Sequence, residues 1–267
     1  MTLGFLDPVA FHLFSKPVYW YGIIIATTVF FAYLLADREA TKRGLKQDTM
    51  LDLLLIALPI AFIFARAYYV IFRWEYYAGD FSSMIAIWDG GIAIYGGLIG
   101  GFLVLYFFAR RRGVKIIKLL DIVAPSLLVG QMLGRWGNFF NHEAYGEIVT
   151  KQYLENRFIP NFIIENMYID GAYRQPTFLY ESLWCLIALV ILLLIRNKLA
   201  QSEVFAAYLI LYGVERFIVE GMRTDSLYIG SLRVSQVLSL VFVVGSLIYL
   251  IVLNTKFKDK KILYRES

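Results

Sequence analysis

The chain has 267 residues, of which 59% are hydrophobic and only 18% are charged, and its formal net charge is +5. An ordinary soluble domain is about half apolar and a quarter charged, so this composition argues against one. The apolar residues fall in long runs, and a membrane-spanning helix needs about 20 mostly apolar residues. We therefore expect an all-α, polytopic integral membrane protein, built as a single transmembrane domain over 1–267 with a small external insertion at about 137–177.

Seven apolar runs are predicted to span the membrane: 18–36, 50–72, 91–109, 119–136, 178–195, 204–220 and 234–253. Pro59 lies inside the second run and is expected to kink it. The third run opens with GGIAIYGGLIGG, which holds two overlapping pairs of small residues, Gly96/Gly100 and Gly97/Gly101. Glycines inside an apolar helix favour close packing of helices over a loop that binds phosphate.

Lysine and arginine are distributed unequally between the two sets of loops. One set holds 16 of them: 37–48, 110–118, 196–203 and 254–267. The other set holds 7: 1–17, 73–90, 137–177 and 221–233. Because cytoplasmic loops carry the excess of basic residues, the first set should be cytoplasmic, with the N-terminus outside and the C-terminus inside. The first run lacks a preceding basic region and a cleavage site, which predicts an uncleaved span. The basic balance then indicates anionic lipid headgroups as partners, and no nucleic acid.

Several kinds of site are excluded by the residue inventory. Cys185 lies in the middle of an apolar run, where a buried structural thiol is expected, since apolar surroundings disfavour the reactive thiolate. The two histidines are His12 and His142, and no Cys/His spacing typical of a metal site occurs, so we expect no metal. Neither GxSxG nor HExxH is present, which argues against an intramembrane hydrolase with its own nucleophile.

Charged residues inside the predicted spans gather in the stretch LYGVERFIVEGMR. Tyr212, Arg216, Glu220 and Arg223 share one helix face. One interpretation is a ladder of ion pairs that ties the bundle together, with Arg216 paired to Glu220. The other is a phosphate site completed by Arg135 at the same predicted end, because arginine makes two-pronged contacts with phosphate.

Two further questions stay open at this point. Arg66, inside the second run, is expected to form a structural pair with Glu181 or Asp121, and the sequence does not decide which. Buried charges also suit a lipid flippase or another transporter. Such a protein predicts discontinuous helices near the midplane in two related halves. The sequence shows no such repeat, and its charges gather at one end of the spans.

The stretch GRWGNFFNHEAYG at 134–146 resembles the signature G-R-x-G-N-F-x-N-x-E-x-x-G of the prolipoprotein diacylglyceryl transferase family. Four further matches follow the family order: WYG at 20–22, WDGGIAIYGGLIGG at 88–101, QPTFLYE at 175–181 and YGVERFIVEGMRTDS at 212–226. The resemblance implies seven spans in a bacterial cell membrane and a site that opens toward its outer face.

The implied reaction moves the diacylglyceryl group of phosphatidylglycerol to the lipobox cysteine thiol in the signal peptide of a prolipoprotein. It forms a thioether and releases glycerol phosphate. The thiol must become a thiolate, the leaving phosphate must be stabilised, and the two substrates must be aligned. The resemblance implies neither metal nor organic cofactor.

The motif match also implies roles for single residues. Arg135 would bind the lipid phosphate, and Arg216 would be the second electrophilic partner. Asn138 and Asn141 would donate hydrogen bonds to headgroup oxygens. Glu143 would orient an arginine or accept a proton.

Glycines and tyrosines complete this set. Gly134, Gly137 and Gly146 are expected to let the backbone bend at the membrane edge beside the lipid. Tyr21 and Tyr212 are candidate walls of the lipid pocket, with a place in the interfacial aromatic belt as the alternative.

One position departs from the family pattern, because Tyr95 stands where many members carry a histidine that is a candidate base. A tyrosine with a pKa near 10 is a poor base at neutral pH, although it can hydrogen-bond a phosphate. His142, beside Glu143, has a suitable pKa range for the base. Glu220 and Arg223 complete the expected substrate-binding set.

Overall fold

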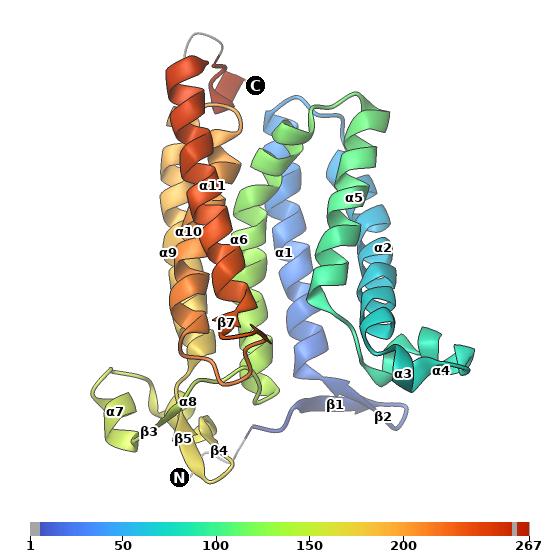
Figure 1. Cartoon of the computed structure of the whole chain (residues 1–267), viewed down its shortest axis with the longest axis vertical. Helices are drawn as coiled ribbons and strands as arrows, with labels where there is room; N and C mark the ends of the chain where they lie inside the picture. The colour runs from blue at the N-terminus through green and yellow to red at the C-terminus, as the bar shows by residue number, and fades with distance from the viewer. Residues whose placement is uncertain (1–5, 258–260, 267) are drawn as a thin grey trace. The chain divides into compact units, whose positions relative to one another are not determined.

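The computed structural model describes residues 6–257 and 261–266, so Lys258 and Lys260, counted above as basic loop residues, lie outside the described residues. Six of the described helices are long and apolar enough to cross a membrane (Figure 1): α1 (Trp20–Lys42), α2 (Thr49–Phe72), α5 (Ile94–Arg112), α6 (Ile116–Phe140), α9 (Thr177–Ile195, continued by η2, Arg196–Lys198) and α11 (Val234–Lys256). The all-α, polytopic prediction is confirmed.

A further long helix, α10 (Glu203–Glu220), occupies the place of the remaining predicted span, 204–220. Its charged residues, among them Glu215, Arg216 and Glu220, keep it out of the set of strongly apolar helices. The number of spans and their orientation therefore stay predictions.

Short elements lie before, between and after the long helices (Figure 1). The helical ones are α3 (Trp74–Tyr77), α4 (Phe81–Ile85), η1 (Ile87–Asp89), α7 (Lys151–Glu155), α8 (Asn161–Asn166) and η4 (Tyr264–Glu266). The strands form three small antiparallel sheets: β1 (Val9–Leu13) with β2 (Lys16–Tyr19); β3 (Ile148–Val149), β5 (Ala172–Arg174) and β4 (Tyr168–Ile169), in that order; and β6 (Tyr228–Ile229) with β7 (Leu232–Arg233). The predicted insertion corresponds to the segment from the end of α6 to the start of α9.

The chain divides into two compact units, one of residues 36–122 and one of residues 1–35 with 123–267. In the first of these, α2 and α5 pack along their lengths. A methyl group added at Gly100 would lie 2.8 Å from Cβ of Phe64, and one at Gly96 would meet the Phe64 carbonyl. The close packing expected of Gly96 and Gly100 is confirmed. The same expectation for Gly97 and Gly101 is wrong, because a methyl group at Gly97 would be 3.7 Å from its nearest neighbour and one at Gly101 would have nothing within 4 Å. The organisation as a single domain stays a prediction.

Arg66 is buried on α2 and anchors the loop that follows it. Its guanidinium donates hydrogen bonds to four backbone carbonyls: Met84 (3.0 Å), Ser83 (2.6 Å), Gly90 (2.5 Å) and Gly91 (2.7 Å). Among the described residues, the hydrogen bonds of Arg66 go to these carbonyls, and neither of its expected partners, Glu181 or Asp121, is among them. A guanidinium has five N–H donors. Backbone carbonyl oxygens accept its hydrogen bonds here, where the sequence had predicted a carboxylate.

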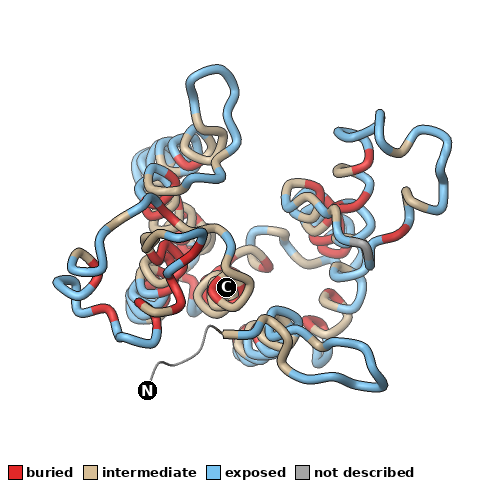
Figure 2. The backbone as a smooth tube through the Cα atoms, turned by 90° about the horizontal axis from the view of Figure 1, so that it is seen from below, coloured by how far each residue is buried: buried red, intermediate tan, exposed pale blue. Residues whose placement is uncertain are grey.

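The other unit has its core between α6, α9 and α10. Figure 2 shows the buried residues of the described chain in red. Cys185 lies in this core and is 2% exposed, as expected for a structural thiol. Tyr264, which follows α11, is also part of this core and is 0% exposed. Its N–H donates to the Leu199 carbonyl (2.8 Å), and Leu263 forms a β-bridge with Ala200. The segment after α11 therefore completes the packing of α9 and α10.

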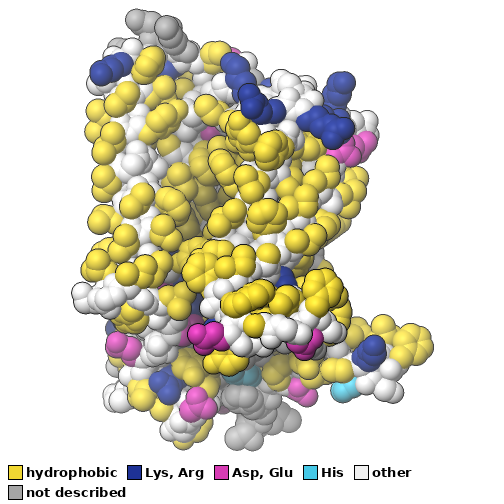
Figure 3. All heavy atoms as spheres, turned by 45° about the vertical axis from the view of Figure 1, so that its right-hand side comes forward, with side chains coloured by type: hydrophobic (Ala, Val, Ile, Leu, Met, Phe, Trp, Pro, Cys, Tyr) yellow, Lys and Arg dark blue, Asp and Glu magenta, His cyan; other side chains and the backbone are white. Residues whose placement is uncertain are grey.

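Large apolar side chains cover the flanks of the long helices, as Figure 3 shows in yellow on one face. Phe30 on α1, Leu55 on α2 and Leu247 on α11 are among those exposed. Such continuous apolar exposure is unusual on a soluble protein and is what a lipid environment requires.

Candidate active site

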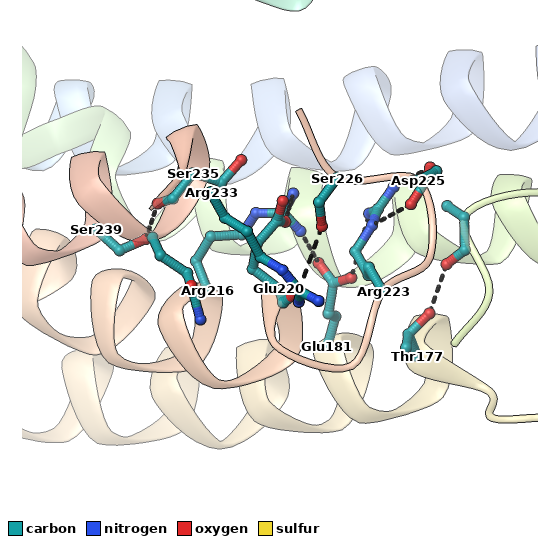
Figure 4. A network of polar contacts seen from close by, with 12 residues as sticks. Thr177, Glu181, Arg216, Glu220, Arg223, Asp225, Ser226, Arg233, Ser235 and Ser239 are labelled. Carbon is teal, nitrogen blue, oxygen red and sulfur yellow. Dashed lines mark hydrogen bonds and ion pairs between the residues drawn. The ribbon is translucent and has the colours of Figure 1, made fainter. Parts of the chain in front are cut away.

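A single buried carboxylate, Glu181, brings three arginines together. It lies near the start of α9 and is 2% exposed. Its Oε2 is 2.5 Å from Nη2 of Arg135 and 3.4 Å from Nη1 of Arg216. Its Oε1 is 3.8 Å from Nη1 of Arg223 (Figure 4). The arginines that the sequence placed at one end of the spans thus converge on one acid.

Two of these arginines have second carboxylate partners. Nη2 of Arg216 lies 2.6 Å from Oε2 of Glu220, so the expected pair on α10 is confirmed. Arg223 makes a two-pronged contact with Asp225, at 2.9 and 2.7 Å. Burial raises the pKa of Asp225, but the hydrogen bonds and charge of Arg223 outweigh it and lower that pKa. The helix ends at Glu220, so Arg223 lies in the turn that follows it. The spacing had predicted a position for Arg223 on the helix face, and this prediction is wrong.

Three chain segments meet to form this arrangement: the end of α6, the start of α9 and the end of α10. The indole of Trp136 on α6 donates to Oγ of Ser182 on α9 (3.1 Å). The indole of Trp184 on α9 donates to the Leu211 carbonyl on α10 (2.9 Å). These tryptophan hydrogen bonds link both neighbours to the helix that carries Glu181 and fix where its carboxylate lies.

The signature stretch forms a tight turn at the end of α6. The Glu143 N–H donates to the Asn138 carbonyl (3.0 Å), and Nδ2 of Asn138 donates to Oε1 of Glu143 (3.2 Å). His142 has a φ of 52° in the left-handed region, which is uncommon for a residue other than glycine. Burial lowers the pKa of His142. The Asn141 N–H continues the helix by donating to the Gly137 carbonyl (3.0 Å), and its side-chain role stays a prediction.

Tyr21 lies against the signature helix. A methyl group at Gly137 would lie 2.7 Å from Cδ2 of Tyr21, and one at Gly134 would lie 3.8 Å from Ile25. Both glycines lie inside α6, so the expectation that they bend the backbone is wrong. Gly137 instead gives space to the Tyr21 ring, which is within electrostatic range of Arg135 and Glu143.

Gly146 closes the turn against the segment after α10. It forms a β-bridge with Arg223, and its N–H donates to the Gln175 carbonyl (2.9 Å). A methyl group there would lie 2.8 Å from Cβ of Gln175 and 3.1 Å from the Met222 carbonyl. Gly146 therefore permits a close approach of backbones beside Arg223.

The remaining predicted residues lie in different places. Tyr212 stacks on Tyr208 within α10, with ring centroids 6.0 Å apart, so part of its ring serves packing. Tyr95 is the second residue of α5, in the unit of residues 36–122, and its substrate role stays a prediction. Within residues 6–257 and 261–266, no three His, Cys, Asp or Glu side chains are grouped to hold a metal ion.

Sequence reasoning missed Glu181 as the centre, and Glu215 and Asp225 as members of the same charged cluster. Glu181 is an isolated carboxylate in an apolar helix, and such a residue needs a partner. That signal was available, but it did not say which arginine would be the partner. Glu215 precedes Arg216 and lies off the face that 212, 216 and 220 share.

Residues 8–252 match the model of the prolipoprotein diacylglyceryl transferase family. The chain belongs to this family. It is 56% identical over 248 residues to the phosphatidylglycerol–prolipoprotein diacylglyceryl transferase of Bacillus cereus strain Q1, covering 92% of each chain. The enzymes of the same name from Bacillus anthracis strain CDC 684 / NRRL 3495 and Bacillus cereus strain 03BB102 are 56% and 55% identical over the same length.

Membership in the prolipoprotein diacylglyceryl transferase family suggests a ligand for the arginine cluster, that is, Arg135, Arg216 and Arg223 around Glu181. The curated relatives are named for a phospholipid with an anionic phosphodiester headgroup. Arginine is the side chain best suited to such a group, because its planar fork pairs with two oxygens at once.

Proposed function

We propose that this chain transfers the diacylglyceryl group of phosphatidylglycerol to the thiol of a prolipoprotein cysteine in a bacterial cell membrane. The names of its relatives and the family match support this function. The observation in the fold that carries it is the convergence of Arg135, Arg216 and Arg223 on Glu181.

In this reaction the substrate thiolate attacks the glycerol carbon of the lipid. A carbon–sulfur bond forms, the carbon–oxygen bond breaks, and the electron pair leaves on the phosphate oxygen. Negative charge gathers on the leaving phosphate, where preorganised positive groups stabilise it best. We assign this task to Arg135 and Arg216, with Arg223 in support. Their carboxylate partners hold the guanidinium planes in place before the lipid arrives.

The thiol proton needs an acceptor. Glu143 is one candidate, because Asn138 holds its carboxylate at the turn after α6. His142 is the other, because burial lowers its pKa and leaves the imidazole neutral and able to accept a proton at neutral pH. We further propose that the turn at 134–146 faces the outer leaflet, where a secreted substrate is accessible.

The direct test supplies the purified protein with phosphatidylglycerol and a peptide that carries a lipobox cysteine. We expect a peptide whose mass is increased by one diacylglyceryl group, together with free glycerol phosphate. A peptide with serine in place of the cysteine is the matched control. An unmodified cysteine peptide, with protein that remains folded and lipid that remains intact, would contradict the proposal.

A further inference from the structure

Glu215 differs from every other acid around the arginine cluster. It lies on α10 next to Arg216 and is 2% exposed. Glu181 and Glu220 each form an ion pair with an arginine. Neither carboxylate oxygen of Glu215 accepts a hydrogen bond from the described residues. A buried carboxyl group without partners is an exception that asks for an explanation.

The surroundings of Glu215 favour its neutral form. An ionised carboxylate buried without a hydrogen bond or ion pair loses its hydration and gains little in return, so such groups stay protonated. From α9, Glu181 adds a like charge and Cys185 an uncharged thiol. The arginines that oppose this effect, namely Arg135, Arg216 and Arg223, are already paired with other carboxylates.

The remaining groups near Glu215 add no compensating charge. Tyr208 and Tyr212, on its own helix, are close enough to interact with it electrostatically and are neutral. Between Val234 and Thr255, α11 carries one titratable side chain, Tyr249, whose hydroxyl donates to Ser202 near the other end of α10.

The charge balance of the cluster depends on this one group. Three arginines face Glu181, Glu220 and the half-exposed Asp225, and a fourth, Arg233, donates to the Glu220 carbonyl, so the cluster has a formal charge of +1 while Glu215 is neutral. Glu143 is exposed, and solvent screens its charge. An ionised Glu215 would cancel this excess positive charge before an anionic phosphodiester arrives.

We propose that Glu215 is a positioning residue that sets the charge of the cluster: its protonated carboxyl lets the arginines accept the phosphodiester of phosphatidylglycerol, and its ionisation weakens that binding. This inference rests on the proposed function. Glu215 acts through the arginines, so its ionisation state governs KM for the lipid more than kcat.

The test compares the full chain with its Glu215→Gln variant, in nanodiscs, across pH of about 6 to about 9. In the unaltered protein, KM for phosphatidylglycerol should rise at alkaline pH, approaching tenfold per pH unit once Glu215 has ionised. In the Glu215→Gln variant, KM for phosphatidylglycerol should not rise over the same alkaline range. The peptide thiol titrates in the same range, but it does so equally for both proteins, so the ratio of their KM values isolates Glu215.

Glu220→Gln is the matched control, because it removes a paired carboxylate from the same helix while Glu215 remains. We expect its KM to keep the alkaline rise. Parallel KM curves for the unaltered protein and Glu215→Gln would overturn the inference.

A second measurement needs no variant. Binding of phosphatidylglycerol to the unaltered protein is measured in the presence of a lipobox peptide in which serine replaces the cysteine, so that no transfer occurs. This binding should weaken as pH rises. Binding that does not change with pH would also overturn the inference. Absence of any thioether at every pH would instead contradict the proposed function itself.

Discussion

Nη2 of Arg135, at the end of α6, lies 2.5 Å from Oε2 of Glu181, near the start of α9. The carboxylate is buried, whereas a fifth of the arginine side chain remains exposed. The protein therefore holds the guanidinium from one side, and part of the side chain stays accessible. This relationship makes Arg135 the first residue to test.

Arg135→Ala should lower the rate of transfer by about 10²–10³, the typical cost of removing one electrostatic partner of a transition state. The double variant with Glu181→Gln should lose less than the sum of the two single changes, because residues in contact are not additive. Thioether formation by mass spectrometry and melting temperature in detergent give the two readouts. Near-normal transfer by Arg135→Ala would contradict the assigned role.

Arg216→Lys keeps the positive charge but loses the two-pronged geometry. We expect transfer to drop sharply while the melting temperature changes little, because the ammonium can still pair with Glu220. Glu220→Gln should instead lower the melting temperature, since it leaves Arg216 with one partner fewer. If the loss of transfer in both variants follows the loss of stability, Arg216 serves structure alone.

Gly137→Ala places a methyl group where the Tyr21 ring now lies, 2.7 Å from its Cδ2. Overpacking of this kind costs about 1–3 kcal/mol, and we expect reduced transfer because the ring is displaced from Arg135. Gly130→Ala is the matched control on the same helix, with open space around the new methyl group. It should leave stability equal or raise it by up to about 1 kcal/mol. Equal behaviour of the two variants would show that the Tyr21 contact is unimportant.

His142 predicts a dependence of stability on pH. Burial lowers its pKa in the folded chain below the value in the unfolded chain, which is about 6.5. The unfolded chain therefore takes up the proton first, and stability is lost as pH falls below about 6.5 until the folded form is protonated as well. His142→Gln should flatten this part of the curve of melting temperature against pH. Identical acid limbs in both proteins would contradict the prediction.

The orientation of the chain can be tested by labelling. A cysteine in place of Lys115, between α5 and α6, should resist membrane-impermeant thiol reagents in intact cells. A cysteine in place of Gln152, in α7, should react. Cys185 is buried and should contribute little background. The opposite pattern would reverse the assigned topology and put the signature turn on the cytoplasmic side.

The long helices were predictable because the membrane constrains the composition of each span separately. Each span must be apolar over its own length, so the run 204–220 predicts α10 to within one residue of its observed bounds, Glu203–Glu220. The convergence of the arginines was predictable in outline for a similar reason. Their positions in the sequence place them near the ends of helices that terminate together.

The partners of those arginines could not be predicted in the same way. Arg216 and Glu181 are 35 residues apart, and their contact depends on how α9 and α10 pack. Arg66 shows the same limit, since its partners are backbone carbonyls that carry no sequence signal. The isolation of Glu215 is likewise a property of the packed helices, visible only once every neighbour has a position.

Tyr264 makes the completion of one core depend on a segment that is synthesised after α11. The core between α9 and α10 contains this tyrosine, which follows α11 in the chain. The two helices that carry Glu181 and Arg216 can therefore enter the membrane early, but their packing stays incomplete until α11 has been inserted and the segment behind it has folded back. A nascent chain that stops before α11 would lack both that helix and the tyrosine that completes this core.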